Sequence, residues 1–348
     1  MKKLLIFFAL SLLSSCIKET DPVVTGLERA YLSGNGVFIM NEGNFRSGNG
    51  SLSFFSYDSM KIYNNIFREA NDRPLGDVPY SIGVNANTAF ILVNNSNKVE
   101  VANLNDMKSV TTIEKIVSPR YISFINSQKA YVTSLYSDSI RVIDLHSKTA
   151  TGYIPLENTS ESIVTVSLRA YTANWNGGCK IFVINTLDDE VIDSIEVGME
   201  PESMVVDRNN TLWVLCNGGW KREHYAELVA INTSTSTISK TLTFPSLSDS
   251  PTCLQIDGGG QFLYYLHNGV RRMDINSETL PATAFIPQAD YFFYRMGVNP
   301  FNDEVFVTDA RDYLQKGIVL RYSREGSLLS LLEADVIPGN MYFKSATK

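Results

Sequence analysis

The same sequence pattern occurs seven times along the chain, at intervals of roughly forty to fifty residues. In every copy an aromatic residue is followed by small or branched apolar residues, and these aromatic positions are Phe38, Phe90, Tyr131, Tyr171, Trp213, Tyr264 and Phe306. Around Trp213, residues 197–217 predict two strands joined by a polar turn. Repetition on this scale is typical of repeat proteins, in which each copy adopts the same local structure.

Each repeat predicts four strands, which we name A to D in chain order. Strand A often follows a proline, strand B starts with the aromatic residue, strand C ends near Asn or Asp, and strand D follows a short polar turn. No helical period persists over about twelve residues, which excludes helical solenoids. The pattern predicts an all-β fold, a seven-bladed β-propeller of four-stranded antiparallel blades over residues 35–348.

The first repeat begins at strand B, Gly36–Asn41, with no strand A before it. The C-terminal segment Ile337–Phe343 has the composition of a strand. We therefore expect this segment to join the first blade and to close the ring.

The N-terminal residues predict a signal peptide over residues 1–15. Lys2 and Lys3 precede the apolar stretch Leu4–Leu13, which is too short to span a bilayer. Leu13–Cys16 then resembles the lipobox of bacterial lipoproteins. That resemblance implies a lipidated Cys16, a tether over residues 16–34, and a protein that contacts the outer membrane only through its anchor and faces the cell exterior. A plain secretory signal is the alternative.

Charge and cysteine spacing argue against several classes of function. The 30 basic and 37 acidic residues give a net charge of -7 without clusters, so we expect no nucleic-acid partner. Cys179, Cys216 and Cys253 show no metal-binding or redox spacing. We expect small buried residues there, with one disulfide as the alternative, and we predict no metal and no cofactor.

Antiparallel strands place the A–B and C–D turns on one face of the ring and the B–C and D–A loops on the other. The first set is short and turn-like. The second set carries aromatic residues with polar neighbours, as binding surfaces do. The aromatic candidates for ligand binding are Phe45, Tyr136, Trp175, Trp220, Tyr225, Tyr294 and Tyr313. The alternative is that these rings cap the core or pack between blades.

Two sets of polar residues complete the candidate site. Residues at the start of strand A should point into the central channel, where they either bind a ligand or form mutual salt bridges. These residues are Tyr80, Arg120, Glu161, Glu202, Thr252 and Arg295, and the candidates for ligand binding among them are Tyr80, Arg120, Glu202 and Arg295. Residues at the end of strand B should form the next ring outward, with side chains that donate and accept hydrogen bonds. These candidates are Asn41, Asn174, Asn217, His267 and Asp309.

The chain contains no sequence motif of a known catalytic class. A Gly-x-Ser-x-Gly elbow, a phosphate loop, a dinucleotide fingerprint and a His-Glu-x-x-His motif are all absent from the sequence. Glu161 and Glu202 are the carboxylate pair that a glycosidase would use. We predict a protein that is not an enzyme.

The four-strand pattern over residues 35–343 resembles YncE-like seven-bladed propellers. Asn41-Glu-Gly-Asn44, followed by a Gly/Asn/Ser-rich loop, is similar to the surface lipoprotein propellers of Bacteroidetes. One branch of that group captures cobalamin above the outer-membrane vitamin B12 transporter. The resemblance implies a monomer that captures a corrinoid and delivers it to a TonB-dependent transporter. Exposed rings among Asn and Asp equally suit a glycan-binding or scaffold component of a nutrient-uptake complex.

Overall fold

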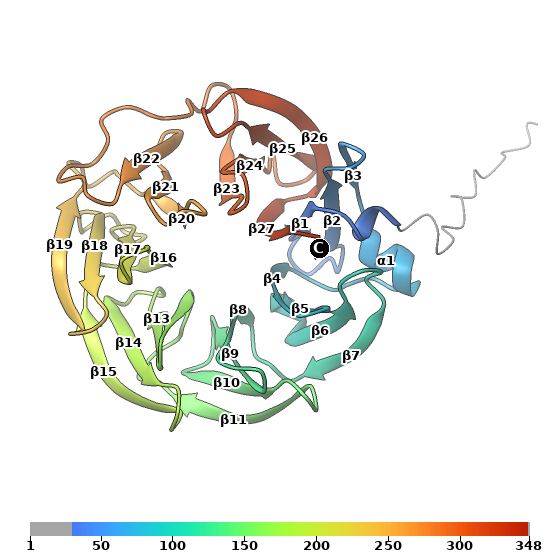
Figure 1. The fold of residues 1–348 in the computed structure, drawn as a ribbon, viewed down its shortest axis with the longest axis horizontal. Helices are drawn as coiled ribbons and strands as arrows, with labels where there is room; N and C mark the ends of the chain where they lie inside the picture. Colours follow the sequence, from blue (N-terminus) through green and yellow to red (C-terminus); the bar gives the residue numbers. More distant parts are fainter. Residues whose placement is uncertain (1–29, 347–348) are drawn as a thin grey trace, which may run out of the picture.

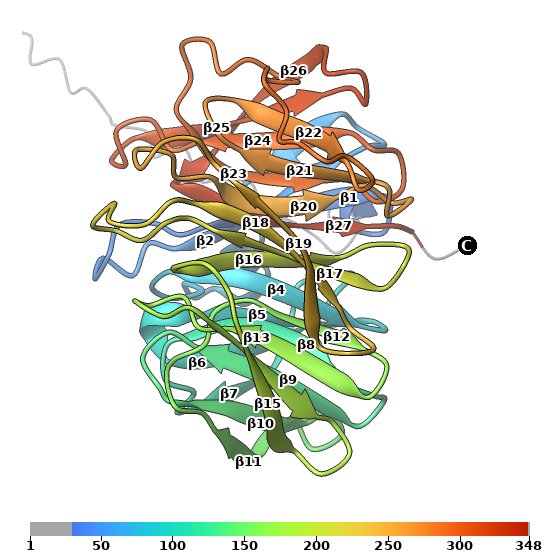
Figure 2. The same ribbon diagram turned by 90° about the vertical axis from the view of Figure 1, so that its left-hand side faces the viewer.

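The computed structural model describes residues 30–346, which form a ring of seven antiparallel sheets around a central channel (Figure 1). Seen from the side, loops extend beyond the strands on both faces of the ring (Figure 2). Six sheets contain four strands and one contains three. The predicted all-β, seven-bladed β-propeller is therefore confirmed.

The strands follow one another around the ring in the order of the sequence. Blade 1 contains β27 (Pro338–Lys344), β1 (Gly36–Asn41), β2 (Ser51–Ser56) and β3 (Lys61–Tyr63). Blade 2 contains β4 (Pro79–Asn85), β5 (Thr88–Val93), β6 (Lys98–Asn103) and β7 (Ser109–Glu114). Blade 3 contains β8 (Pro119–Phe124), β9 (Lys129–Ser134), β10 (Ser139–Asp144) and β11 (Thr149–Pro155).

The remaining four blades complete the circle. Blade 4 contains β12 (Ile163–Val166), β13 (Arg169–Ala173), β14 (Lys180–Asn185) and β15 (Glu190–Glu196). Blade 5 contains β16 (Pro201–Val206), β17 (Thr211–Cys216), β18 (Glu227–Asn232) and β19 (Thr237–Thr243). Blade 6 contains β20 (Thr252–Ile256), β21 (Phe262–Leu266) and β22 (Val270–Asp274). Blade 7 contains β23 (Phe293–Val298), β24 (Val305–Asp309), β25 (Lys316–Tyr322) and β26 (Leu328–Val336).

The C-terminal strand closes the ring as the sequence predicts. β27 pairs with β1 in an antiparallel register that places Val37 opposite Phe343 and Ile39 opposite Met341. Blade 1 therefore combines residues from both ends of the described chain. The pairing covers the inner edge of β1, which would otherwise be unpaired at the point where the ring closes.

Two connections depart from the repeat pattern. In blade 6, the expected fourth strand is replaced by an irregular segment in which only Ile286 forms an isolated bridge, to Val270. Pro281 and Pro287 lie in this segment, and proline has no N–H for a strand ladder. The short helix α1 (Ile66–Asn71), between blades 1 and 2, was not predicted because it is shorter than the helical window that we considered. Two short 3-10 helices, Ala30–Leu32 and Asn94–Ser96, complete the regular elements of residues 30–346.

Burial explains why each strand has its own composition. β1 and β2 are buried along their whole length, whereas all but one residue of the outer strand β15 is exposed. The hydrophobic core consists of seven clusters, and each lies between two neighbouring blades. Between blades 3 and 4, for example, Tyr131 and Ile140 pack against Ala170 and Phe182.

The three cysteines of the propeller are free thiols. Cys216 and Cys253 are buried and Cys179 is partly buried. The expectation of small buried residues is confirmed for Cys216 and Cys253, whereas Cys179 is only partly buried, and the alternative disulfide does not form among these three cysteines. The predicted signal peptide and Cys16 lie outside the described residues, and within residues 30–346 no helix is long and apolar enough to cross a membrane.

Candidate functional site

Five of the predicted aromatic residues are exposed on the B–C and D–A loops, which together form what we call the loop face. Trp220 is 87% exposed, and the other four are Phe45, Tyr136, Tyr225 and Tyr313. Phe292 on the same face is also exposed and was not among the candidates. Large rings left in water on loops are available for contact with a ligand or partner.

The most exposed ring lies beside a small cleft between blades 4 and 5. The cleft has a volume of about 250 Å³ and is lined by Gly177, Met199, Glu200, Gly218, Gly219, Trp220, Lys221, Glu223 and His224. Gly218 and Gly219 have positive φ values of 83° and 85°, a backbone shape that favours glycine. These two glycines start the loop that carries Trp220 away from the end of β17.

Trp175 and Tyr294 are more enclosed than the sequence suggests. Trp175 is partly buried, and its Nε1 atom is buried without a hydrogen-bond partner among residues 30–346. The Tyr294 hydroxyl donates to Glu42 Oε1 at 3.0 Å, and its ring packs edge-on against Tyr313. These two rings contribute to packing as well as to the surface.

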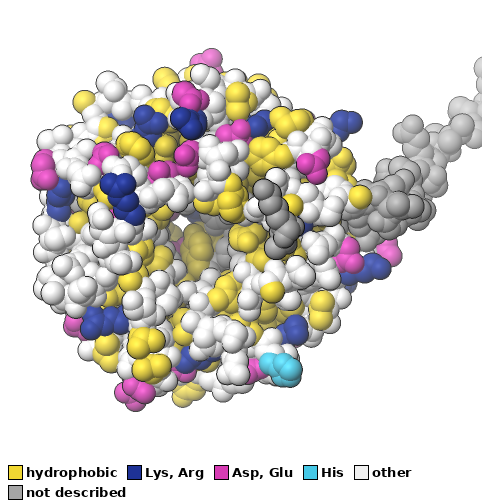
Figure 3. All heavy atoms as spheres, viewed as in Figure 1, with side chains coloured by type: hydrophobic (Ala, Val, Ile, Leu, Met, Phe, Trp, Pro, Cys, Tyr) yellow, Lys and Arg dark blue, Asp and Glu magenta, His cyan; other side chains and the backbone are white. Residues whose placement is uncertain are grey.

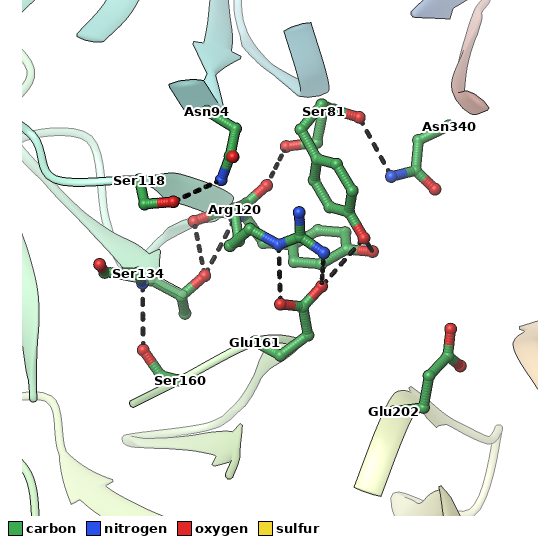
Figure 4. A network of polar contacts seen from close by, with 12 residues as sticks. Ser81, Asn94, Ser118, Arg120, Ser134, Ser160, Glu161, Glu202 and Asn340 are labelled. Carbon is green, nitrogen blue, oxygen red and sulfur yellow. Dashed lines mark hydrogen bonds and ion pairs between the residues drawn. The ribbon is translucent and has the colours of Figure 1, made fainter. Parts of the chain in front are cut away.

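The predicted channel residues form a buried network of mutual contacts (Figure 4). Arg120 donates two hydrogen bonds of 2.7 Å to the carboxylate of Glu161. The Tyr80 hydroxyl also donates to Glu161, at 2.9 Å, and the Arg120 guanidinium lies 3.3 Å from the centre of the Tyr80 ring. Of the two predicted roles for these side chains, the structure contains the salt bridges.

A second arginine extends this network across the channel. Arg295 pairs with Glu202 at 3.1 Å and donates to the Tyr80 hydroxyl at 3.2 Å. The other oxygen of Glu202 accepts the backbone N–H of Cys253 at 2.9 Å. Glu161 and Glu202, the pair considered for a glycosidase, are thus each bound to a different arginine.

Burial and charge act against each other in this network. Burial disfavours a charged Arg120, but Glu161, Tyr80 and Tyr121 together outweigh that effect and raise the pKa of the guanidinium above its usual value. Burial raises the pKa of the Tyr80 hydroxyl, although both arginines oppose that shift. The network therefore holds both arginines charged and Tyr80 neutral.

Glu42 is a site residue that sequence reasoning missed. Burial raises the pKa of its carboxyl group, and Arg295 acts in the opposite direction. Gly339 approaches so closely that a Cβ there would lie 2.8 Å from Glu42 Oε1. The sequence signal that could have identified Glu42 was its position, because it directly follows Asn41 at the end of a buried strand.

The residues at the ends of the B strands are mostly committed to holding loops. Asn41 donates to Ser51 and Ser53, and Asn174 donates to the carbonyl of Thr159. Asn217 accepts from the N–H of Gly219, and Asp309 accepts from the N–H groups of Phe292 and Arg311. All four side chains are buried and hold loops from beneath the surface, and their contact with a ligand stays a prediction. His267 differs from them, because it borders a cleft and contacts Asp249.

The structure thus divides the predicted residues into two layers. A buried polar layer at the channel contains Tyr80, Arg120, Glu161, Glu202 and Arg295, with Glu42 added. An outer layer of exposed rings lies on the loops around it. Within residues 30–346, no cluster of His, Cys, Asp and Glu side chains is arranged to hold a metal ion.

The buried ion pair at the channel makes a testable contribution to stability. We predict that Glu161→Ala lowers the free energy of unfolding by about 3–5 kcal/mol, because it leaves Arg120 buried without a counter-charge. Chemical denaturation followed by circular dichroism measures this change. The matched control is Glu157→Ala, which removes an exposed partner of Lys180 and should leave the free energy of unfolding almost unchanged. Equal effects of the two substitutions would contradict the role given to the buried pair.

Solved structures share the fold at low sequence identity. A quinonprotein alcohol dehydrogenase-like protein from Bacteroides thetaiotaomicron aligns with a TM-score of 0.70 and 13% identity, covering 90% of this chain and 78% of its own. A putative 6-phosphogluconolactonase from Bacteroides uniformis aligns with a TM-score of 0.69 and 11% identity, covering 89% of this chain and 99% of its own. Virginiamycin B lyase from Staphylococcus aureus aligns with a TM-score of 0.58 and 16% identity, covering 74% of this chain and 84% of its own. At these identities the likeness shows the propeller fold alone.

A comparison with curated proteins finds no match. The model of one protein family, described as a domain of unknown function (DUF5074), matches residues 35–340. This match covers nearly the whole propeller, from β1 into β27. The chain therefore belongs to the DUF5074 family.

Proposed function

We propose that this protein is a non-enzymatic capture protein that binds a bulky polar ligand on its loop face. The observation that carries the proposal is the exposure of several large rings on that one face, led by Trp220. Rigid aromatic side chains give a large contact area at a low cost in conformational entropy. Figure 3 shows the opposite face, on which charged side chains of both signs are scattered among hydrophobic ones around the central opening.

The buried network supports capture by making the floor of this face rigid. Arg120, Glu161, Tyr80, Arg295 and Glu202 each bind a partner from another blade. A ligand above them therefore meets a fixed polar surface. Preorganisation of this kind lowers the entropy lost on binding.

A corrinoid is the ligand that we propose first. Its broad macrocycle is edged with amides, so it needs a wide rim with flat apolar contacts and several polar partners. The exposed rings supply the apolar contacts, and the Asn- and Gly-rich loops between them supply backbone and side-chain hydrogen bonds. Asn41–Asn44 is similar to the surface lipoprotein propellers of Bacteroidetes, and the branch of that group that captures cobalamin supplies the name of the ligand.

A glycan-binding role is the second candidate. It is favoured by a polar cleft between blades 6 and 7 that is bordered by one exposed phenylalanine. Sugars stack on aromatic rings and hydrogen-bond to Asp, Asn and His side chains. Co-purification with an uptake complex, without binding of either small ligand, would instead support a scaffold role.

The proposed place of action is the outer surface of the outer membrane. A lipid on Cys16 would anchor the protein there, and a TonB-dependent transporter would receive the ligand. The sequence Leu13–Cys16 supports the anchor. The transporter is proposed from the resemblance to cobalamin-capturing lipoproteins.

Trp220 tests the corrinoid proposal directly. We predict that the propeller binds cyanocobalamin and that Trp220→Ala weakens binding by roughly 2 kcal/mol or more without changing the melting temperature. The melting temperature should hold because the ring is 87% exposed. Isothermal titration calorimetry measures the affinity. The control is Tyr153→Ala, an exposed ring on β11, which should bind like the wild type. An absence of heat at micromolar protein would refute the corrinoid proposal.

Cys16 tests the proposed location. We predict that Cys16→Ala converts a membrane-bound protein into a soluble periplasmic or secreted one, because the thiol is the attachment point for lipid. Cell fractionation followed by immunoblotting measures the distribution. Cys179→Ala, which changes a cysteine within the propeller, should stay with the membrane fraction. A Cys16→Ala protein that is still membrane-bound would contradict the lipid anchor.

A further inference from the structure

A cleft of about 410 Å³ lies on the loop face between blades 6 and 7. It is bordered by the loop before β20, by the turn between β21 and β22, and by the segment that enters β23. Its lining is mostly polar: Ser248, Asp249, Ser250, Thr252, His267, Asn268 and Gln288, with Leu266, Phe292 and Phe293 as the apolar part. The volume lies within the range of ordinary small-molecule sites, roughly 300–1,000 Å³.

A fixed pair of polar side chains lies at the wall of this cleft. The Nε2 atom of His267 is 3.4 Å from Oδ1 of Asp249, and both side chains are largely buried. The other carboxylate oxygen of Asp249 accepts the N–H of Ser246 at 3.0 Å, and the Phe244 ring packs edge-on against the imidazole. Neither side chain needs to reorganise when a ligand arrives.

The charge state of this pair follows from its surroundings. Burial lowers the pKa of His267, and Arg271 lowers it further, while Asp249 acts in the opposite direction. A neutral imidazole that directs its Nε2–H toward Asp249 keeps Nδ1 as a hydrogen-bond acceptor. The wall therefore presents acceptors on both the imidazole and the carboxylate.

Two more polar side chains are free to bind a ligand. The Ser250 hydroxyl and the Asn268 amide have no hydrogen-bond partner within residues 30–346 and can both donate and accept. Asn268 occupies a turn with a φ of 48° and is followed by Gly269 with a φ of 111°. This left-handed turn holds the amide at the border of the cleft.

The exposed ring in the apolar part of the border is Phe292. The Phe292 side chain is 51% exposed, and its ring packs edge-on against Tyr313. Its backbone N–H donates to Asp309 at 3.1 Å, which fixes the segment. A flat exposed ring and hydrogen-bonding side chains in the border of one cleft suit a molecule with one apolar side and several hydroxyl groups.

The lining also indicates which ligands do not fit. Asp249 is its only charged side chain, so a phosphate or carboxylate would meet an unfavourable charge. An apolar ligand would strip water from the polar side chains without replacing their hydrogen bonds. A sugar ring is uncharged and polar, so it avoids both problems. Its C–H face stacks on an aromatic ring, and its hydroxyl groups donate and accept hydrogen bonds.

We propose that this cleft is a saccharide-binding subsite, in which Asp249, His267, Ser250 and Asn268 hydrogen-bond ring hydroxyls and Phe292 stacks on the sugar. The inference rests on the proposed capture function of the loop face and specifies one part of it. The sugar is either a unit of a free glycan or the sugar carried by a larger ligand, such as the ribose of cobalamin. The recognition chemistry is the same in both cases.

The test uses the intact propeller and two sets of probes. The first is a panel of gluco-, galacto-, manno- and xylo-oligosaccharides, and the second is cyanocobalamin beside cobinamide, which lacks the nucleotide sugar. Phe292→Ala and Asp249→Asn should each weaken saccharide binding about tenfold, or remove the preference for cyanocobalamin over cobinamide. Phe301→Ala is the matched control, because that phenylalanine is exposed in the turn between β23 and β24 on the opposite face. Melting curves show whether each variant is folded.

The outcomes separate this proposal from the general one. If saccharides bind and corrinoids do not, the saccharide-binding subsite is supported and the corrinoid proposal is refuted. If cyanocobalamin and cobinamide bind with equal affinity, and Phe292→Ala does not change that affinity, the capture function stands and the saccharide subsite is overturned. Failure of every sugar and of both corrinoids to bind overturns both proposals.

Discussion

The pairing of β27 with β1 is the constraint on which the rest of the molecule depends. Each blade buries its faces only against its two neighbours, so an open ring would expose two apolar faces to water. The last strand of the described chain completes the first blade and brings Phe343 against the cluster shared with blade 7. Because the ring is closed by main-chain hydrogen bonds, its central channel keeps a fixed shape.

That closed ring brings together side chains that are far apart in the sequence. Tyr80, Arg120, Glu161, Glu202 and Arg295 come from five blades, yet they meet in one network at the axis. Each charge there is paired, which offsets the cost of burial. The B–C loops can therefore vary in length and composition around a rigid centre. The cleft beside Trp220 and the cleft beside Phe292 are two results of that variation.

The sequence predicted the ring well because strands repeat with a regular alternation and an aromatic start. It also predicted the closing strand and the partition of loops between two faces. It did not distinguish Trp220, which is exposed, from Trp175, which is partly buried, because both lie in glycine-rich loops after a B strand. Asn41 and Asp309 were assigned to a ligand for a similar reason. A polar side chain at a strand end has the same sequence signal whether it holds a loop or faces a ligand. Only the position of the neighbouring backbone decides which of the two roles the side chain has.

The central claim is that one face captures the ligand while the opposite face and the channel stay unchanged. Hydrogen–deuterium exchange of the intact propeller, with and without saturating cyanocobalamin, tests this claim most directly. The account predicts slower exchange in the loop-face segments 42–49, 174–178 and 218–225. It predicts no change in the A–B turns 207–210 and 257–260. Protection in the A–B turns, or no protection anywhere at saturating ligand, would contradict it.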